Sequence, residues 1–182
     1  MKLDWTEIEG LRFFLTHKFN DERGFLNVLH DSGSKTDALS VSSCFQRLLL
    51  VESKRGTIRG IHRARRDFPE HKFVACISGR VREVLVDLRL DSPTFGAHTE
   101  LILDSSESYA LCIPHGVGQA YEVISNTALL IYALNTEYAP ERELTINAFD
   151  PVIGIDWGTG FIQSKRDKDA PGLEQIKLMN LL

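Results

Sequence analysis

Short segments rich in β-forming residues recur along most of the chain, and they restrict the possible folds more than any other feature. The segments consist of β-branched, aromatic and leucine residues, and Gly, Pro, Asp or Ser separate many of them. This pattern predicts strands at residues 13–16, 25–29, 45–51, 73–78, 81–88, 98–103, 109–113, 119–124 and 129–134. So many short strands at nearly regular spacing favour a β-sandwich or barrel, and a jelly roll fits a chain of 182 residues.

Two segments add detail to this all-β prediction. In residues 81–88, Val84, Val86 and Leu88 share one face, which is typical of a strand buried on one side. In residues 172–182, Leu173, Ile176 and Met179 recur every third residue, so a short C-terminal helical segment is expected there. No internal repeat, low-complexity segment or linker is present, and we expect one domain over residues 1–182.

The net charge of −4 argues against nonspecific nucleic-acid binding, which requires a basic field over the whole contact surface. No segment of the sequence is apolar over a length that could span a bilayer, and the N-terminus lacks an apolar core of signal-peptide length. We therefore expect neither nucleic acid nor a membrane as a partner.

The three cysteines, Cys44, Cys76 and Cys112, lie far apart in apolar surroundings. No pair has the spacing of a metal or redox motif, and an odd number does not suit a disulfide framework. They are therefore interpreted as buried free thiols in a reducing compartment. This predicts a cytoplasmic protein.

One stretch carries most of the chemical information, namely Arg59-Gly60-Ile61-His62-Arg63-Ala64-Arg65-Arg66, followed by Lys72. An arginine can bind phosphate oxygens through two parallel hydrogen bonds, and histidine is suited to proton transfer near neutral pH. The combination indicates an enzyme that acts on a phosphorylated small molecule. By itself the motif is equally compatible with a strand end whose basic side chains are only solvated.

A jelly-roll barrel also suggests a metal-binding cupin as an alternative. Gly56 lies six residues before His62, and Pro114-His115-Gly116 forms a Pro-x-Gly motif, both of which are found in cupins. A metal cupin would have further histidines at positions 64 and 119, where this chain has Ala64 and Gln119. Because one imidazole cannot hold a divalent metal without other converging ligands, we expect no metal site.

The chain resembles the dTDP-4-dehydrorhamnose 3,5-epimerases, a metal-free branch of the cupin superfamily that acts on nucleotide-linked 4-keto sugars. The resemblance covers residues 21–171, and several motifs occur in the family's order. They are Asp21-Glu22-Arg23-Gly24-Phe25, Arg59-Gly60-Ile61-His62, Val86-Asp87-Leu88-Arg89, Ser92-Pro93-Thr94-Phe95-Gly96, Ile113-Pro114-His115-Gly116, Tyr132, Tyr138-Ala139-Pro140-Glu141-Arg142-Glu143 and Asp150-Pro151-Val152-Ile153-Gly154-Ile155-Asp156-Trp157. The resemblance implies a cupin-type jelly roll, no cofactor, and a homodimer that exchanges N-terminal strands. In such a dimer, residues 21–30 pair with the neighbouring sheet and Arg23 enters the neighbour's active site.

The resemblance also implies roles for four catalytic residues. His62 is the base, and an aspartate near the C-terminus orients it; the family's Lys-Asp-x-x-Ala-Pro motif selects Asp167, with Asp169 as the alternative. Lys72 lies against the C4 oxygen of the sugar and stabilises an enolate. Tyr132 is the acid on the opposite face, although by itself it would be interpreted as a core tyrosine.

Substrate binding follows the family in part. Arg23 and Arg59 are the candidates for the diphosphate, and Tyr138 is expected beside the nucleotide base. Arg47, Leu49, Val51 and Val28 replace polar residues of the family pattern, Ser53 is retained, and Gln119 replaces a histidine. Arg47 and Gln119 are therefore candidate substrate contacts that differ from the family. This predicts a nucleotide or sugar different from that of the rhamnose pathway, with dTDP, GDP and others left open.

The leading hypothesis is an epimerase that acts at C3 and C5 of a nucleotide-diphosphate-linked 4-keto sugar through an enolate. One alternative is a sugar-nucleotide 3,4-ketoisomerase, which typically has a His-x-His motif that Ala64 breaks. The other is a non-catalytic sugar-nucleotide-binding cupin. The joint presence of His62, Lys72, Tyr132 and Asp167 argues against it, since binding needs no base and opposed acid. Whether one or both carbons react stays open.

Overall fold

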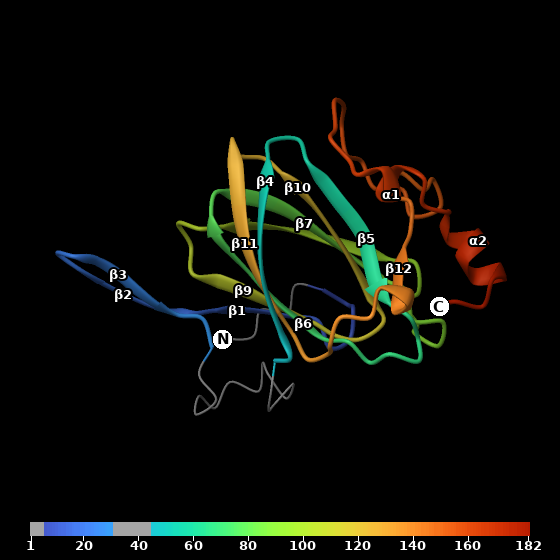
Figure 1. The fold of residues 1–182 in the computed structure, drawn as a ribbon, viewed down its shortest axis with the longest axis horizontal. Coiled ribbons are helices and arrows are strands. Elements are labelled where there is room, and N and C mark those ends of the chain that lie inside the picture. The colour runs from blue at the N-terminus through green and yellow to red at the C-terminus, as the bar shows by residue number, and fades with distance from the viewer. Residues whose placement is uncertain (1–5, 31–44) are drawn as a thin grey trace.

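Two antiparallel five-stranded sheets form the body of the molecule in the computed structural model, which describes residues 6–30 and 45–182. One sheet has the order β1-β9-β6-β11-β4 and the other β12-β5-β10-β7-β8 (Figure 1). The strands are β1 (Arg12–Leu15), β2 (His17–Asp21), β3 (Gly24–Val28), β4 (Arg47–Lys54), β5 (Ile58–Ala64), β6 (Lys72–Ser78), β7 (Arg80–Asp87), β8 (His98–Asp104), β9 (Tyr109–Ile113), β10 (Val117–Val123), β11 (Thr127–Leu134) and β12 (Glu143–Thr145). The predicted all-β jelly roll of cupin type is confirmed. Cys44 lies outside the described residues.

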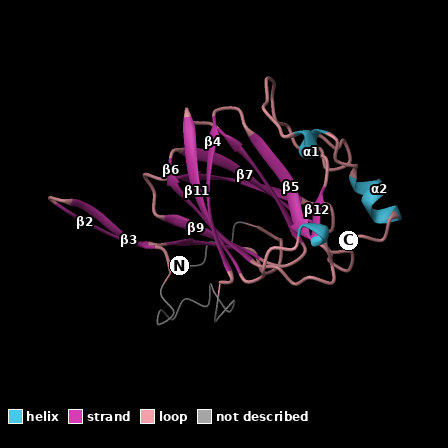
Figure 2. Ribbon diagram, in the orientation of Figure 1, coloured by secondary structure: helices cyan, strands magenta, loops and turns pink. Residues whose placement is uncertain are grey.

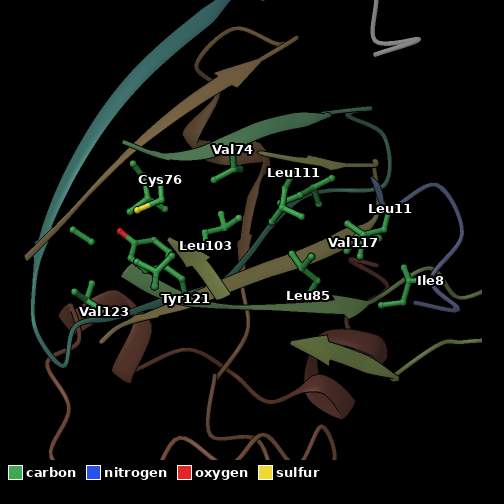
Figure 3. Packing of buried hydrophobic residues seen from close by; sticks show 14 residues of the cluster. Ile8, Leu11, Val74, Cys76, Leu85, Leu103, Leu111, Val117, Tyr121 and Val123 are labelled. Carbon is green, nitrogen blue, oxygen red and sulfur yellow. The ribbon is translucent and has the colours of Figure 1, made fainter. Parts of the chain in front are cut away.

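The main core lies between the two sheets (Figure 3). Val74, Leu111 and Leu130 come from the first sheet, and Leu85 and Leu103 come from the second. All five are at most 1% exposed, so their burial removes nearly all of their apolar surface from water. This packing holds the sheets face to face and leaves one end of the interior for polar side chains.

Strand β7 is buried on both faces, whereas the sequence predicted burial on one. Val81 and Leu85 belong to the core between the sheets. Val84 and Val86 instead pack under the C-terminal segment, against Ile146, Ile155, Trp157 and their neighbours. The segment that follows β12 thus covers the outer surface of the second sheet, and a strand covered on both sides is apolar throughout.

Three strands were not predicted from the sequence: β2, β5 and β12. Strand β5 carries the sequence Ile-Arg-Gly-Ile-His-Arg-Ala, in which glycine and two arginines weaken the strand signal. It forms because β10 and β12 flank it in the sheet, and cross-strand pairing overrides a weak local preference. The predicted strand 109–113 coincides with β9, and the other predicted strands differ from the observed ones by at most three residues at either end.

The C-terminal region holds two short α-helices, α1 (Lys165–Lys168) and α2 (Leu173–Leu178) (Figure 2). Helix α2 lies within the predicted range 172–182, but α1 was not expected. Leu173 and Ile176 are buried as predicted, while Met179 is 55% exposed because the helix ends before it. None of the helices in residues 6–30 and 45–182 is both long and apolar enough to cross a membrane.

Strands β2 and β3 form a hairpin that projects away from the body of the protein (Figures 1 and 2). Within the part of the chain that the structure describes, they pair only with each other, in a separate two-stranded sheet. An isolated two-stranded hairpin of this kind is marginally stable in water.

Candidate active site

A cavity of about 210 Å³ opens at the polar end of the interior, where both sheets contribute side chains. Its wall combines charged, aromatic and apolar groups. The lining residues are Arg47, Leu49, Val51, Arg59, His62, Arg63, Glu70, Lys72, Gln119, Tyr121, Tyr132, Leu134, Glu143 and Arg166. Six of the residues predicted for the site therefore lie in one pocket: His62, Lys72, Tyr132, Arg59, Arg47 and Gln119.

A bulge in β5 brings Arg59 and His62 to the same side of the strand. Gln119 of β10 pairs with His62, whereas Tyr121, two residues further on, pairs with Arg59, so β5 contains one extra residue. The extra residue interrupts the alternation of faces, and both side chains reach the pocket although they are three positions apart.

Gly60 makes the bulge possible. Its φ is +126°, and a Cβ there would lie 2.5 Å from the Cβ of Ala120 and 2.6 Å from the carbonyl oxygen of Gln119. No other residue type fits this position without moving β10.

His62 and Asp167 form the central polar pair of the site. His62 Nε2 lies 2.6 Å from Asp167 Oδ1, and Ser164 Oγ donates to Asp167 Oδ2 over 2.8 Å. Burial raises the pKa of the Asp167 carboxyl, but the hydrogen bonds from His62 and Ser164 outweigh it and hold the pKa below its usual value. An ionised Asp167 accepts the Nε2 proton, so Nδ1 is the nitrogen left unprotonated.

Helix α1 delivers Asp167 to the histidine. Ser164 caps the helix by accepting the backbone N–H of Asp167, and Asp167 is the buried residue of that turn. Asp169, the alternative from the sequence, is exposed and pairs with Lys165. The structure thus brings Asp167, and not Asp169, to His62.

Lys72 stands at the start of β6 with its ammonium group largely buried. Its Nζ lies 3.4 Å from the backbone oxygen of His62 and 3.7 Å from Glu70 Oε1. Burial lowers the pKa of Lys72, although Glu70 and Glu143 act in the opposite direction. A cation held in this way beside the histidine can bind an oxygen that becomes negative during a reaction.

Tyr132 lies on β11, in the sheet opposite to that of His62. Gln119 Nε2 is 3.4 Å from Tyr132 Oη and 3.0 Å from Glu83 Oε2. Glu83 is completely buried, and burial raises the pKa of its carboxyl to about 8. Burial also raises the pKa of Tyr132 well above its usual value, so the phenol keeps its proton at neutral pH.

Two arginines lie at the wall where the sequence placed the substrate. Arg59 Nε donates to Ser53 Oγ over 3.0 Å, and Ser53 Oγ lies 3.0 Å from Tyr121 Oη. The guanidinium of Arg47 lies over the ring of Tyr138, 4.7 Å from its centroid. Tyr138 does not line the pocket itself; it is 65% exposed, and Arg47 covers one face of its ring.

The dense arginine cluster predicted around His62 is assembled only in part, because Arg59 and Arg63 line the pocket whereas Arg65 and Arg66 do not. Arg65 lies 3.9 Å from Asp67 and Arg66 lies 3.1 Å from Asp91, both away from this pocket. Arg63 is buried and donates to the backbone oxygens of Ala64 and Leu88. Strand alternation and the turn after β5 separate side chains that are adjacent in sequence.

Arg23 does not enter the pocket of its own chain. It lies at the tip of the β2–β3 hairpin, where it is 88% exposed and pairs with Asp21. The carboxylate raises the pKa of Arg23 and the guanidinium lowers the pKa of Asp21.

Several pocket residues were missed by sequence reasoning, including Glu70, Glu143 and Arg166, and so was Glu83 behind Gln119. The predicted one-sided burial of residues 81–88 put Val84 and Val86 on the buried face, which placed Glu83 on the opposite face of the strand. Arg166 pairs with Glu143 over 2.8 Å and nothing in its local sequence indicated that contact. Among residues 6–30 and 45–182, no three His, Cys, Asp or Glu side chains are grouped as a metal site.

Comparison with known proteins gives one consistent result. The model of the dTDP-4-dehydrorhamnose 3,5-epimerase family matches residues 5–175. A dTDP-4-dehydrorhamnose 3,5-epimerase from Streptomyces griseus is 31% identical over 177 residues, which cover 96% of this chain and 88% of the relative.

Two solved structures are similar over nearly the whole fold. A 4-keto-6-deoxy sugar epimerase from the novobiocin biosynthetic gene cluster of Streptomyces spheroides has a TM-score of 0.91 and 32% identity, covering 97% of this chain and 89% of that one. A 3′-monoepimerase from Streptomyces bikiniensis, in complex with dTDP-quinovose, has a TM-score of 0.90 and 30% identity, covering 97% and 90%.

Proposed function

The chain belongs to the dTDP-4-dehydrorhamnose 3,5-epimerase family, and on this premise we propose how its own residues epimerise a nucleotide-linked 4-keto sugar. It is an isomerase of the epimerase class. The observation that carries the proposed mechanism is the His62–Asp167 pair, which faces the same pocket as Tyr132 from the opposite sheet. A base and an acid on opposite sides of one cavity are what inversion at a carbon requires.

The reaction begins with removal of a proton from the carbon beside the C4 carbonyl. His62 accepts this proton at Nδ1, and the electron pair of the C–H bond forms the double bond of an enolate. Asp167 stabilises the resulting imidazolium through Nε2. The negative charge develops on the C4 oxygen, where Lys72 stabilises it; one such contact contributes about 3 kcal/mol in comparable sites.

Tyr132 completes the inversion by returning a proton to the opposite side of the same carbon. The enolate electrons then form the new C–H bond and the C4 carbonyl is restored. Proton exchange with water afterwards returns the phenol and the imidazole to their starting states. Because the returned proton comes from solvent, each inverted carbon carries a solvent hydrogen.

The nucleotide diphosphate extends toward the arginines at the wall of the pocket. Arg59 is oriented by Ser53 to bind phosphate oxygens, and Arg23 reaches them from a second subunit. Arg47 and Tyr138 form the surface for the base, and Gln119 contacts the sugar. The apolar side chains Leu49 and Val51 change this wall relative to the family pattern, which favours a sugar or nucleotide other than that of the rhamnose pathway.

Incubation of the protein with a dTDP-linked 4-keto-6-deoxy sugar in heavy water tests the function. NMR should show deuterium at C3 and C5 together with inverted product. Deuterium at C3 alone would reduce the activity to that of a 3-epimerase, which is the activity of the S. bikiniensis relative. Binding without any exchange would favour a non-catalytic binding protein, and movement of the keto group to C3 would favour the ketoisomerase.

We also propose a homodimer in which the β2–β3 hairpin crosses to the neighbouring subunit. Phe19, Phe25 and Leu26 are each more than 60% exposed on this hairpin, which forms a separate two-stranded sheet. Exposed apolar side chains of this size mark interaction surfaces, and the crossing brings Arg23 to a second pocket.

Light scattering at micromolar concentration should therefore report a stable dimer. Leu26→Glu should shift it toward the monomer and weaken nucleotide binding, because charge is buried at the contact. The matched control is Leu178→Glu on helix α2, where Leu178 is 87% exposed away from the hairpin. A wild-type monomer would contradict the exchange of arms.

A cytoplasmic location remains part of the proposal. Cys76 and Cys112 are free and buried in the described structure, which suits a reducing compartment. Fractionation of cells that contain the protein would place it, and recovery outside the cytoplasm would contradict this expectation.

A further inference from the structure

We propose that Glu83, which lies behind the wall of the pocket, is a positioning residue: it orients the side-chain amide of Gln119 so that Tyr132 directs its hydroxyl proton toward the substrate. The inference rests on the proposed function, since Tyr132 is the acid of that reaction. It adds a residue to the site and gives Gln119 a role besides substrate contact.

The geometry places the Gln119 amide nitrogen between two oxygens. Nε2 lies 3.0 Å from Glu83 Oε2 and 3.4 Å from Tyr132 Oη. A primary amide has two N–H groups that point in different directions, so one nitrogen can donate to both oxygens at once. In this arrangement the oxygen of Tyr132 is an acceptor.

An accepting phenol oxygen keeps its own proton available. Among residues 6–30 and 45–182, Gln119 is the residue that shares a hydrogen bond with Tyr132 Oη. Tyr132 lines the pocket, so the hydroxyl proton can point into it. If the amide of Gln119 were rotated by half a turn, its oxygen would face Tyr132 and accept that proton, and the acid would point away from the sugar.

Glu83 selects the productive orientation of the amide. Its Oε2 accepts from Gln119, while Oε1 is buried and has no hydrogen-bond partner among the described residues. Burial raises the pKa of this carboxyl to about 8, and the Gln119 N–H bonded to Oε2 makes that oxygen an acceptor. Oε2 then stays an acceptor and continues to require the amide nitrogen of Gln119.

The variant that tests this is Glu83→Gln, which keeps the size and a hydrogen bond to Gln119. A carboxamide at position 83 offers either an oxygen or a nitrogen, so Gln119 is no longer held in one orientation. Inversion should slow about 10-fold, less than the 10²–10⁴-fold attributed to a positioned acid or base, because Tyr132 is still present. KM and deuterium exchange catalysed by His62 should stay near wild type, so the ratio of exchange to inversion rises.

Glu83→Asp retains the carboxyl but withdraws it from Gln119, and the same rise in that ratio is expected. The matched control is Glu122→Gln on β10, a carboxylate that pairs with Arg82, and it should behave as wild type. Thermal unfolding of each variant shows that the fold is retained.

A second measurement separates positioning from general damage. In a Tyr132→Phe background, Glu83→Gln should have no further effect on inversion, because the hydroxyl that it orients is gone. The inference would be overturned if Glu83→Gln inverted the sugar at the wild-type rate. It would also be overturned if Glu83→Gln reduced the inversion rate by the same factor with Tyr132 and with Phe at position 132. Failure of the proposed function looks different, because the wild-type protein would then show neither exchange nor inversion.

Discussion

Replacing His62 with alanine should abolish deuterium incorporation at both C3 and C5 of the 4-keto sugar. His62 Nδ1 is the free nitrogen of an imidazole whose other nitrogen is held by Asp167, and the described pocket offers no second histidine. Removal of a general base costs about 10²–10⁴-fold, and here the same group would serve both carbons. The rate of exchange, measured by NMR in heavy water, should fall by about 10³–10⁴-fold, the upper part of that range.

His98→Ala is the matched control for this variant. His98 lies on β8, an edge strand of the second sheet, and its Nε2 is 3.8 Å from Oε1 of Glu100 on the same strand. It does not line the pocket, so its loss should leave exchange unchanged. Nucleotide binding by the His62 variant, followed by calorimetry, should persist because the arginines are untouched. Full exchange in His62→Ala would remove His62 from the mechanism.

Asp167→Asn is expected to reduce turnover by roughly 10³–10⁴-fold, although the shape of the side chain hardly changes. An asparagine amide can donate to His62 Nε2, which moves the imidazole proton to Nδ1 and removes the base. The same substitution in the Ser-His-Asp hydrolases costs about 10⁴-fold for this reason. Steady-state kinetics should show the loss in kcat, with KM little changed.

Asp169→Asn provides the control in the same helical turn. Asp169 is exposed and pairs with Lys165, so its variant should retain nearly full activity. If Asp169→Asn were as damaging as Asp167→Asn, the orienting role would not belong to Asp167. Asp167 also accepts a hydrogen bond from Ser164, so its loss could damage the fold. Thermal unfolding of both variants separates such damage from the loss of histidine orientation.

Local patterns predicted the strand bounds best at residues 109–113, which coincide with β9, and at residues 73–78, which match β6 to within one residue. They failed at β5, because Gly60 and the arginines mask a strand whose position depends on β10 and β12. They also wrongly predicted that β7 is buried on one side only, since residues far along the chain cover its outer face. Such burial depends on contacts that no local pattern contains.

In the candidate site, too, local sequence patterns identified some features and long-range contacts decided others. Motifs in the sequence identified His62, Lys72, Tyr132 and Asp167 by resemblance, and all four meet at or beside one cavity. The run from Arg59 to Arg66 suggested a single cationic cluster, but its members point to different partners. A run of adjacent residues on a strand alternates between faces, so proximity in sequence is a poor guide to proximity in a site.

The sequence by itself determined the β-rich composition, the order of the motifs and the types of side chain available for proton transfer. Those properties depend on residue identity and local spacing. Only the tertiary structure decided that the bulge at Gly60 turns Arg59 and His62 to one side of β5. It also decided that α1 presents Asp167, and not Asp169, to the histidine. The contact of Glu83 with Tyr132 through Gln119 was likewise decided by the fold. Each of these depends on strand register or long-range packing, which positions a side chain to within a fraction of an ångström and is set by the whole fold.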